Sequence, residues 1–347
     1  MVYVIDTGVY IDHEEFEGRA RWGKTIPKND LDIDGNGHGT HCAGTIGSRR
    51  YGVAKSANIT AVKVLGTNGS GTMGDVIAGV DWAAGDAKRL AKEAAAELKA
   101  TGKTKHKGSV ANMSLGGSKS PGLDDIVNRA VKSGLHFAVA AGNDNRDACD
   151  YSPAAAELAV TVGASTLTDE RAYFSNYGKC VDVFAPGLNI LSTWNSGPNA
   201  VNTISGTSMA SPHTAGLLAY LLSIYPHTTF DPLVADDILP PVLDTSAKHV
   251  ESVFASAYAA AYEVLPGFLT RVLPSPEIFE SSEEIVAPIP PVTMTPALLK
   301  KALIALASSD KLVGQQLPTG TPNLLIFNNA TDASGRSWLD DNFWANL

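Results

Sequence analysis

Six short apolar runs, rich in β-branched residues, alternate with helical patterns over residues 1–225. The runs are VYVIDTG, NITAVKVL, SVANMSLGG, LHFAVAAGN, LAVTVGAS and CVDVFAPG, and each ends at or just before a glycine or another small residue. Apolar residues recur with helical spacing between several of them, most clearly at 73–100 and 123–133. Strands that alternate with helices form a parallel sheet with helices on both faces. The sequence therefore predicts an α/β fold of three layers around a central, mostly parallel sheet.

Composition and charge exclude two classes of partner. The 347 residues, 44% apolar and 18% charged, can bury a large core. The chain contains no apolar run of the roughly 18 residues that a membrane helix needs. Its net charge of −9 argues against a nucleic-acid partner. The first residues already form a strand pattern, so we expect the chain to start inside a longer precursor.

The segment ISGTSMASPHTAG, residues 204–216, places Ser208 just before an apolar run. The run predicts a buried helix that begins near Thr207 or Ser208. Pro212 is then expected in the first turn, where a proline costs no hydrogen bond. The N–H groups of a helix N-terminus favour developing negative charge, which suits a nucleophile. Taken alone, Ser208 is more readily interpreted as a helix-capping serine than as a nucleophile.

Asp6 and His38 supply the groups that would activate such a serine. Asp6 ends the first strand pattern, and His38 lies among glycines at the start of a predicted helix. Ligands bind at the carboxyl ends of parallel strands, where Asp6, Ser114 and Asn143 all fall. A buried carboxylate, an imidazole and a hydroxyl are what acyl transfer requires. Each residue alone has a structural interpretation, and only the combination, in the order Asp, His, Ser, predicts catalysis.

Eight sequence islands occur in one order along the chain: IDTGV, GNGHGTHCAGTIG, NMSLGG, AAGNDN, TVGAST, YFSNYGKCVDVFAPG, ISGTSMASPHTAGL and GTPNLLIFNN. Together they resemble the subtilisin-type serine proteases (subtilases), and among these the proteinase K and cerevisin (fungal vacuolar protease B) group. The resemblance covers residues 1–226 and 294–329. It implies a subtilisin-like fold and an endopeptidase of broad specificity that prefers aromatic or large aliphatic P1 residues.

The resemblance also implies a role for each matching residue. Asp6 would orient His38, His38 would act as general base and then acid, and Ser208 would be the nucleophile. Asn143 would donate to the oxyanion together with the N–H of Ser208. The residues expected to bind substrate are Gly69, Ser70, Gly71, Ser114, Leu115, Gly116, Ala140, Ala141 and Gly142. His41 and His213 lie inside the motifs and are expected to be structural.

Two segments resemble calcium ligands. The stretch DIDGNG matches the start of an EF-hand loop, but Ala43 stands where that loop needs its bidentate Glu, so we reject it. The family's calcium site matches the Asp182 carboxylate with the carbonyls of Glu157 and Ala159. A structural Ca²⁺ is expected there, whereas the chemistry itself requires no cofactor.

The three cysteines are Cys42, Cys149 and Cys180. By resemblance, Cys42 is a free thiol beneath His38, although a small buried apolar residue also fits that position. Cys149 and Cys180 match a cysteine pair of cerevisin-like members, so we expect a disulfide and a secreted or vacuolar enzyme.

The resemblance divides the chain into a catalytic domain and additions. The domain comprises 1–226 and 294–329, with an N-terminal part expected to be missing, and its last helix is predicted to start at Thr295 and Pro296. Residues 85–108 are expected to extend a helix into solvent. Residues 227–293 hold ten acidic side chains against Lys248 and Arg271. We interpret them as a surface ornament, in preference to a processed segment or a docking element. A tail follows at 330–347.

Partners and rival functions complete the expectations. We expect a monomer that acts on protein and peptide substrates and is inhibited and helped to fold by its own propeptide. An inactive scaffold and an esterase or peptide ligase are the alternatives. Retention of all three catalytic residues argues against the first, and the SLGG strand edge favours peptide substrates.

Overall fold

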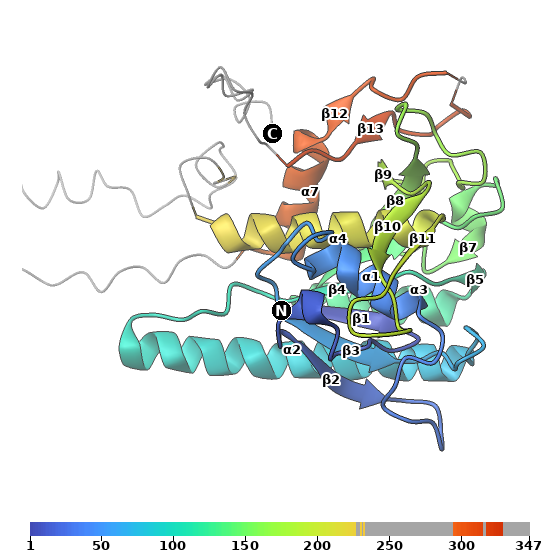
Figure 1. Ribbon diagram of the computed structural model, residues 1–347. Coiled ribbons are helices and arrows are strands. Elements are labelled where there is room, and N and C mark those ends of the chain that lie inside the picture. The colour runs from blue at the N-terminus through green and yellow to red at the C-terminus, as the bar shows by residue number, and fades with distance from the viewer. Residues whose placement is uncertain (227–229, 231, 233–293, 315–316, 329–347) are drawn as a thin grey trace, which may run out of the picture. The chain divides into compact units, whose positions relative to one another are not determined.

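The computed structural model describes residues 1–226, 230, 232, 294–314 and 317–328. A nine-stranded sheet forms the centre, in the order β12-β13-β9-β8-β6-β4-β1-β3-β2 (Figure 1). Its strands are β1 (Val2–Asp6), β2 (Ala20–Thr25), β3 (Ile59–Lys63), β4 (Val110–Met113), β6 (His136–Ala140), β8 (Val160–Ser165), β9 (Val183–Pro186), β12 (Ser308–Ser309) and β13 (Leu324–Leu325). Every neighbouring pair is parallel except β12 with β13. The mostly parallel sheet is confirmed.

Five α-helices are described: α1 (His38–Gly47), α2 (Met73–Thr101), α3 (Pro121–Lys132), α4 (Thr207–Ile224) and α7 (Pro296–Leu306). Two small sheets pair β5 (Gly117–Ser118) with β7 (Tyr151–Ser152) and β10 (Ile190–Thr193) with β11 (Val201–Ile204). Short 3₁₀ helices span Glu14–Phe16 and Ala148–Asp150. Strand β2 and the β10–β11 hairpin were not predicted, because their half-exposed residues form no continuous apolar run.

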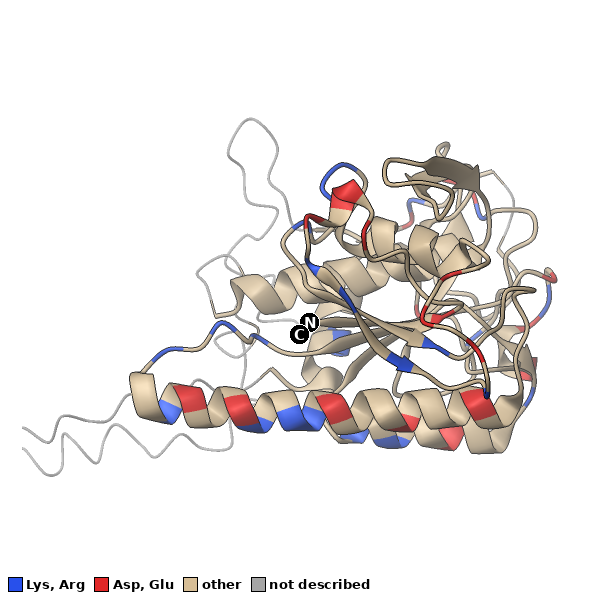
Figure 2. Cartoon of the chain, turned by 60° about the horizontal axis from the view of Figure 1, so that its bottom comes forward, with Lys and Arg blue, Asp and Glu red and all other residues tan. Residues whose placement is uncertain are grey.

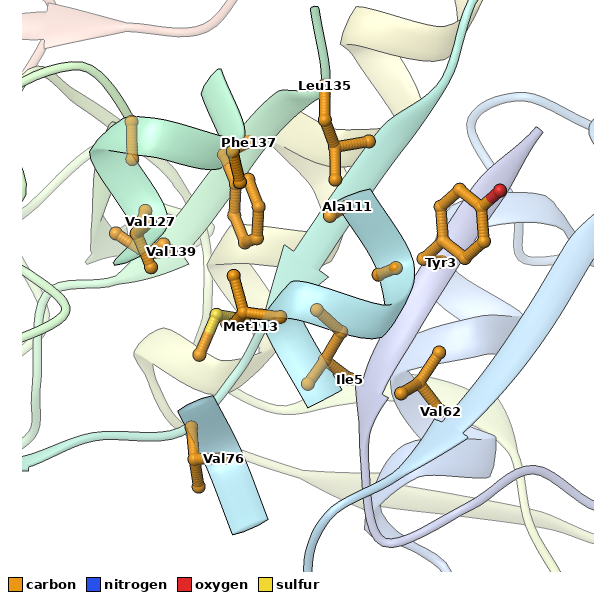
Figure 3. Close-up of a cluster of buried hydrophobic side chains, with 14 of the residues drawn as sticks. Tyr3, Ile5, Val62, Val76, Ala111, Met113, Val127, Leu135, Phe137 and Val139 are labelled. Carbon is orange, nitrogen blue, oxygen red and sulfur yellow. The ribbon is translucent and has the colours of Figure 1, made fainter. Parts of the chain in front are cut away.

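Alternate side chains of β1 point to opposite faces of the sheet, one toward the core and one toward the candidate active site. Tyr3 and Ile5 enter a cluster with residues of α2 and α3, including Val76 and Val127 (Figure 3). The other face of β1 receives α1 and carries Asp6, so the carboxylate points toward the helix that begins at His38.

Capping residues set the helix ends. Thr72 caps α2 through the N–H of Asp75. Thr295 caps α7 just before Pro296, and this second cap is the one that the sequence predicted. Helix α2 continues to Thr101, although Ala87 is its last buried residue. Charged residues of both signs line the rest of this helix (Figure 2). None of the described helices is both long and apolar enough for a membrane span.

Helix α4 contradicts one expectation. It begins at Thr207, so Pro212 lies in the second turn, not the first. The proline removes the N–H that would bond to the carbonyl of Ser208. That carbonyl instead accepts hydrogen bonds from Ser114 Oγ at 2.7 Å and from Cys42 Sγ at 3.4 Å. The freed carbonyl therefore ties the helix to β4 and α1. The expectations for segment 227–293 and the tail at 330–347 lie outside the described residues, apart from Phe230 and Pro232.

Candidate active site

The buried Asp6 and the partly buried His38 form a pair where β1 meets α1. His38 Nδ1 lies 2.8 Å from Asp6 Oδ1, which also accepts the N–H of Thr7 at 2.7 Å. The Asp6 side chain is 0% exposed, and its Oδ2 has no partner among the described residues. A carboxylate can only accept, so Nδ1 carries the proton. The neutral ring then leaves Nε2 as a proton acceptor.

The environment of His38 shifts its basicity. Burial lowers the pKa of His38, but the charge and hydrogen bond of Asp6, with a contribution from Asp34, outweigh burial and raise it above 6.5. A negative neighbour stabilises the imidazolium form. His38 is therefore built to take up a proton.

Asp34 holds the start of α1 in place. Its two oxygens accept five hydrogen bonds, from Thr7 Oγ1 and from the N–H groups of Asn36, Gly37 and Thr40, the last also through its hydroxyl. Thr7 Oγ1 in turn accepts the N–H of Gly39 at 3.0 Å. A Cβ at Gly39 would collide with the Gly8 carbonyl, so only glycine permits this approach. The sequence offered Asp34 only within the rejected EF-hand pattern.

Ser208 lies in the first turn of α4. Its hydroxyl donates to the Ser114 carbonyl at 3.2 Å, and no hydrogen bond joins it to His38 in the described part of the chain. Catalytic hydrogen bonds are often loose before substrate binds. A buried network, Ser211 Oγ to Asn112 Oδ1 at 2.7 Å and Asn112 Nδ2 to Ser114 Oγ at 2.9 Å, fixes α4 against β4.

The side chain of Asn143 lies close to Ser208, across Gly206. Its Oδ1 accepts from the N–H of Thr207 at 2.8 Å and from Thr207 Oγ1 at 2.9 Å, which leaves Nδ2 to donate. A Cβ added at Gly206 would lie 3.5 Å from Asn143 Nδ2 and 3.7 Å from Ser208 Cβ, so the two side chains flank one position. Asn176 steadies the loop by accepting from the N–H groups of Asp144 and Arg146 and donating to Ala141 O.

Two adjoining hollows flank the segment that follows β4. His38 and Gly69–Gly71 line one, and Ser208, Asn143 and Ala140–Gly142 line the other. Leu115 and Gly116 line both. The structure thus brings all nine residues predicted to bind substrate to the two hollows beside His38 and Ser208.

Comparison with known proteins decides the family. The sequence profile of the subtilase family matches residues 1–250. Over 326 residues the chain is 55% identical to the subtilisin-like serine protease Pen c 2 of Penicillium citrinum, covering 94% of this chain and 58% of that protein. Over 254 residues it is 67% identical to the subtilisin-like serine protease Cur l 4.0101 of Cochliobolus lunatus, covering 73% and 49%. The chain belongs to the subtilase family.

A solved structure supports the fold. The crystal structure of a cold-adapted subtilisin-like serine proteinase matches this subtilase with a TM-score of 0.65 and 38% identity, covering 95% of this chain and 89% of that one. The fold is subtilisin-like. The chain spans about half the length of the curated relatives it matches.

The expected calcium ligands of this subtilase converge, but on a lysine. Lys300 Nζ donates to the carbonyls of Glu157 at 2.9 Å and Ala159 at 2.6 Å, and it lies 2.8 Å from Asp182 Oδ2. The Lys300 ammonium thus lies between the three oxygens that the calcium site would use. The sequence could not foresee this, because Lys300 belongs to none of the matching islands.

The cysteines and the two remaining motif histidines are buried or bonded. Cys149 and Cys180 are joined in a disulfide with their Cα atoms 5.3 Å apart. Cys42 is a free buried thiol, and burial raises its pKa well above the ordinary value. His41 Nε2 bonds to Ile190 O, and burial lowers the pKa of His41 to about 4. His213 Nδ1 bonds within α4 to Met209 O. Neither histidine lines the two hollows.

Proposed function

We propose that this subtilase is a serine endopeptidase that works through an acyl-enzyme. The observation that carries the proposal is the Asp6–His38 pair at 2.8 Å, whose histidine lines one hollow while Ser208 and Asn143 line the adjoining one. Such a constellation is recognised by its geometry and roles rather than by sequence position. The subtilase relatives named as serine proteases support it.

The chemistry begins when Ser208 turns. Its hydroxyl leaves the Ser114 carbonyl and approaches His38 Nε2, which accepts the proton as Oγ attacks the peptide carbonyl. Asp6 keeps Nδ1 protonated and stabilises the imidazolium. The oxyanion takes hydrogen bonds from Asn143 Nδ2 and the N–H of Ser208. His38 then protonates the leaving amine, and water repeats the sequence to release the acyl group.

Substrate would bind as an added β-strand. Ser114–Gly116 and Gly69–Gly71 border the cleft and offer backbone groups on two sides of an extended peptide. The pocket beside Ser208 has walls of small residues, Ala140, Ala141 and Gly142, and the one charged side chain in its described lining, Asp144, is exposed. These features favour aromatic or large aliphatic P1 side chains.

The remaining proposals concern the setting of the enzyme. Protein and peptide substrates follow from the strand-binding edges, and the chemistry uses no cofactor. The Cys149–Cys180 disulfide suits an oxidising compartment, so we place the enzyme outside the cell or in the vacuole. We further propose that it acts as a monomer and that its own propeptide inhibits it.

An activated-serine probe tests the catalytic proposal. A fluorophosphonate should label Ser208, identified by mass spectrometry, and should inactivate the enzyme toward protein substrates. Ser208→Ala should lose both labelling and proteolysis, while Ser205→Ala, a matched change at an exposed neighbour, should keep both. A folded Ser208→Ala variant that still cuts protein at the parent rate would contradict the proposal. Absence of labelling in a folded parent would instead favour an inactive scaffold.

A further inference from the structure

Lys300 reaches from α7 to the starts of two strands. Helix α7 buries Leu299, Ala302, Leu303 and Leu306, and Lys300 lies at the border of this apolar face. Its ammonium meets one acceptor for each of its three protons: Glu157 O, Ala159 O and Asp182 Oδ2, at 2.6 to 2.9 Å. Its side chain is only 19% exposed, so these bonds are largely shielded from water.

The three oxygens are held by the backbone of the sheet. Asp182 Oδ2 also accepts the N–H of Thr161 at 2.8 Å, and the N–H of Asp182 donates to Thr161 O at 2.9 Å. Glu157 and Ala159 immediately precede β8, and Asp182 precedes β9. We define the cage as Glu157 O, Ala159 O and Asp182 Oδ2, which lie side by side where β8 and β9 begin.

Charge and coordination favour the lysine over a metal ion. The cage has one carboxylate, which a single positive charge balances. Calcium takes six to eight oxygen ligands at about 2.3–2.6 Å. A calcium ion in the cage would have to displace the ammonium and then lie beside it.

We propose that the Lys300 ammonium is the resident structural cation of this cage, in place of calcium. A bound ion stabilises a fold only to the extent that its concentration exceeds its dissociation constant. An ammonium on the chain itself has no such dependence. Helix α7 of this subtilase therefore stays attached to the starts of β8 and β9 in the presence of a calcium chelator.

Thermal melts of the full-length protein in a Ser208→Ala background, which prevents autolysis, test the proposal. Lys300→Met keeps the length and packing of the side chain but removes the charge. Lys301→Met is the control, since Lys301 is exposed on the same helix and forms no ion pair in the described residues. In chelator, Lys300→Met should melt about 3–6 °C below Lys301→Met, because three oxygens lose their donor.

Calcium titration supplies a second readout, which needs no Lys300 variant to fold. Calcium bound at other sites shifts Tm equally in the parent and in Asp182→Asn, so the difference between the two shifts reports on the cage alone. We expect the two shifts to be equal. A larger shift in the parent would show that calcium occupies the cage and would overturn the proposal. Equal Tm values for Lys300→Met and Lys301→Met would overturn it as well.

Discussion

Two carboxylates of this subtilase each lie 2.8 Å from a nitrogen, and the two pairs are built in opposite ways. Asp6 is fully buried beside His38, and its Oδ2 has no partner among the described residues. Asp182 is 21% exposed beside Lys300, and all three protons of that ammonium are engaged. The Asp6–His38 pair thus keeps an unused acceptor, whereas the Asp182–Lys300 pair is saturated, with every ammonium proton bonded.

The difference matches what each nitrogen must do. In the proposed cycle His38 gains and loses a proton, and a buried carboxylate with spare accepting capacity stabilises the imidazolium as it forms. Lys300 keeps its charge throughout, so saturation of its donors costs nothing and fixes three segments of backbone. In this molecule an unfilled acceptor beside a titratable base thus sets the proposed catalytic pair apart from the Asp182–Lys300 pair.

The largest effect is expected from Asp6→Asn. The amide keeps the size of the side chain but favours the wrong tautomer of His38, so kcat should fall by about 10⁴. Steady-state kinetics on a peptide ester would measure this loss, with a melt to show that the fold is kept. A loss below tenfold would mean that Asp6 is not the partner of His38 in the reaction.

Asn143→Ala should have the next largest effect. It removes one oxyanion donor, and in subtilisin such a loss lowers kcat by about 10²–10³. KM should change little, because the donor acts on the transition state rather than on bound substrate. The control is Asn145→Ala in the same loop, which lies outside both hollows and should stay near the parent rate. A raised KM with an unchanged kcat would contradict the oxyanion role.

The pH profile tests directly whether Asp6 raises the pKa of His38. Burial lowers the pKa of His38, but Asp6 and Asp34 together raise it above 6.5. The base must be neutral, so kcat/KM should rise with pH through a midpoint above 6.5 and fall about tenfold per pH unit below it. In Asp6→Asn the midpoint, followed by NMR of His38 in the Ser208→Ala background, should move down. A midpoint that stays in place would assign the shift to other charges.

The fold and the positions of the candidate site residues were predictable because their signals are local. Buried strands form continuous apolar runs, and Asp6 and Asn143 follow such runs directly. Ser208 and His38 lie in glycine-rich segments at the starts of helices. Convergence then follows from parallel topology, which brings strand ends to one edge.

Lys300 and Pro212 were not predictable for the opposite reason. Carbonyl ligands place no constraint on residue type, so Glu157 and Ala159 could not reveal what lies between them. Lys300 comes from α7, beyond segment 227–293 in the chain. The tolerance of Pro212 depends on Ser114 and Cys42, which are remote in sequence. Their side chains donate hydrogen bonds to the Ser208 carbonyl, which the proline leaves without its intrahelical donor.

The smallest effect is expected from Asp182→Asn, the same chemical change as Asp6→Asn made in the saturated pair. The amide oxygen can still accept from Lys300 and from the N–H of Thr161, so the cage loses charge but keeps its hydrogen bonds. Partly exposed ion pairs contribute on the order of 1 kcal/mol, which corresponds to a fall in Tm of about 2–4 °C. Because neither Asp182 nor Lys300 lines the cleft, kcat/KM should stay within about twofold of the parent. A fall in kcat/KM for Asp182→Asn as large as that for Asp6→Asn would contradict this expectation. It would show that the cage is coupled to the active site.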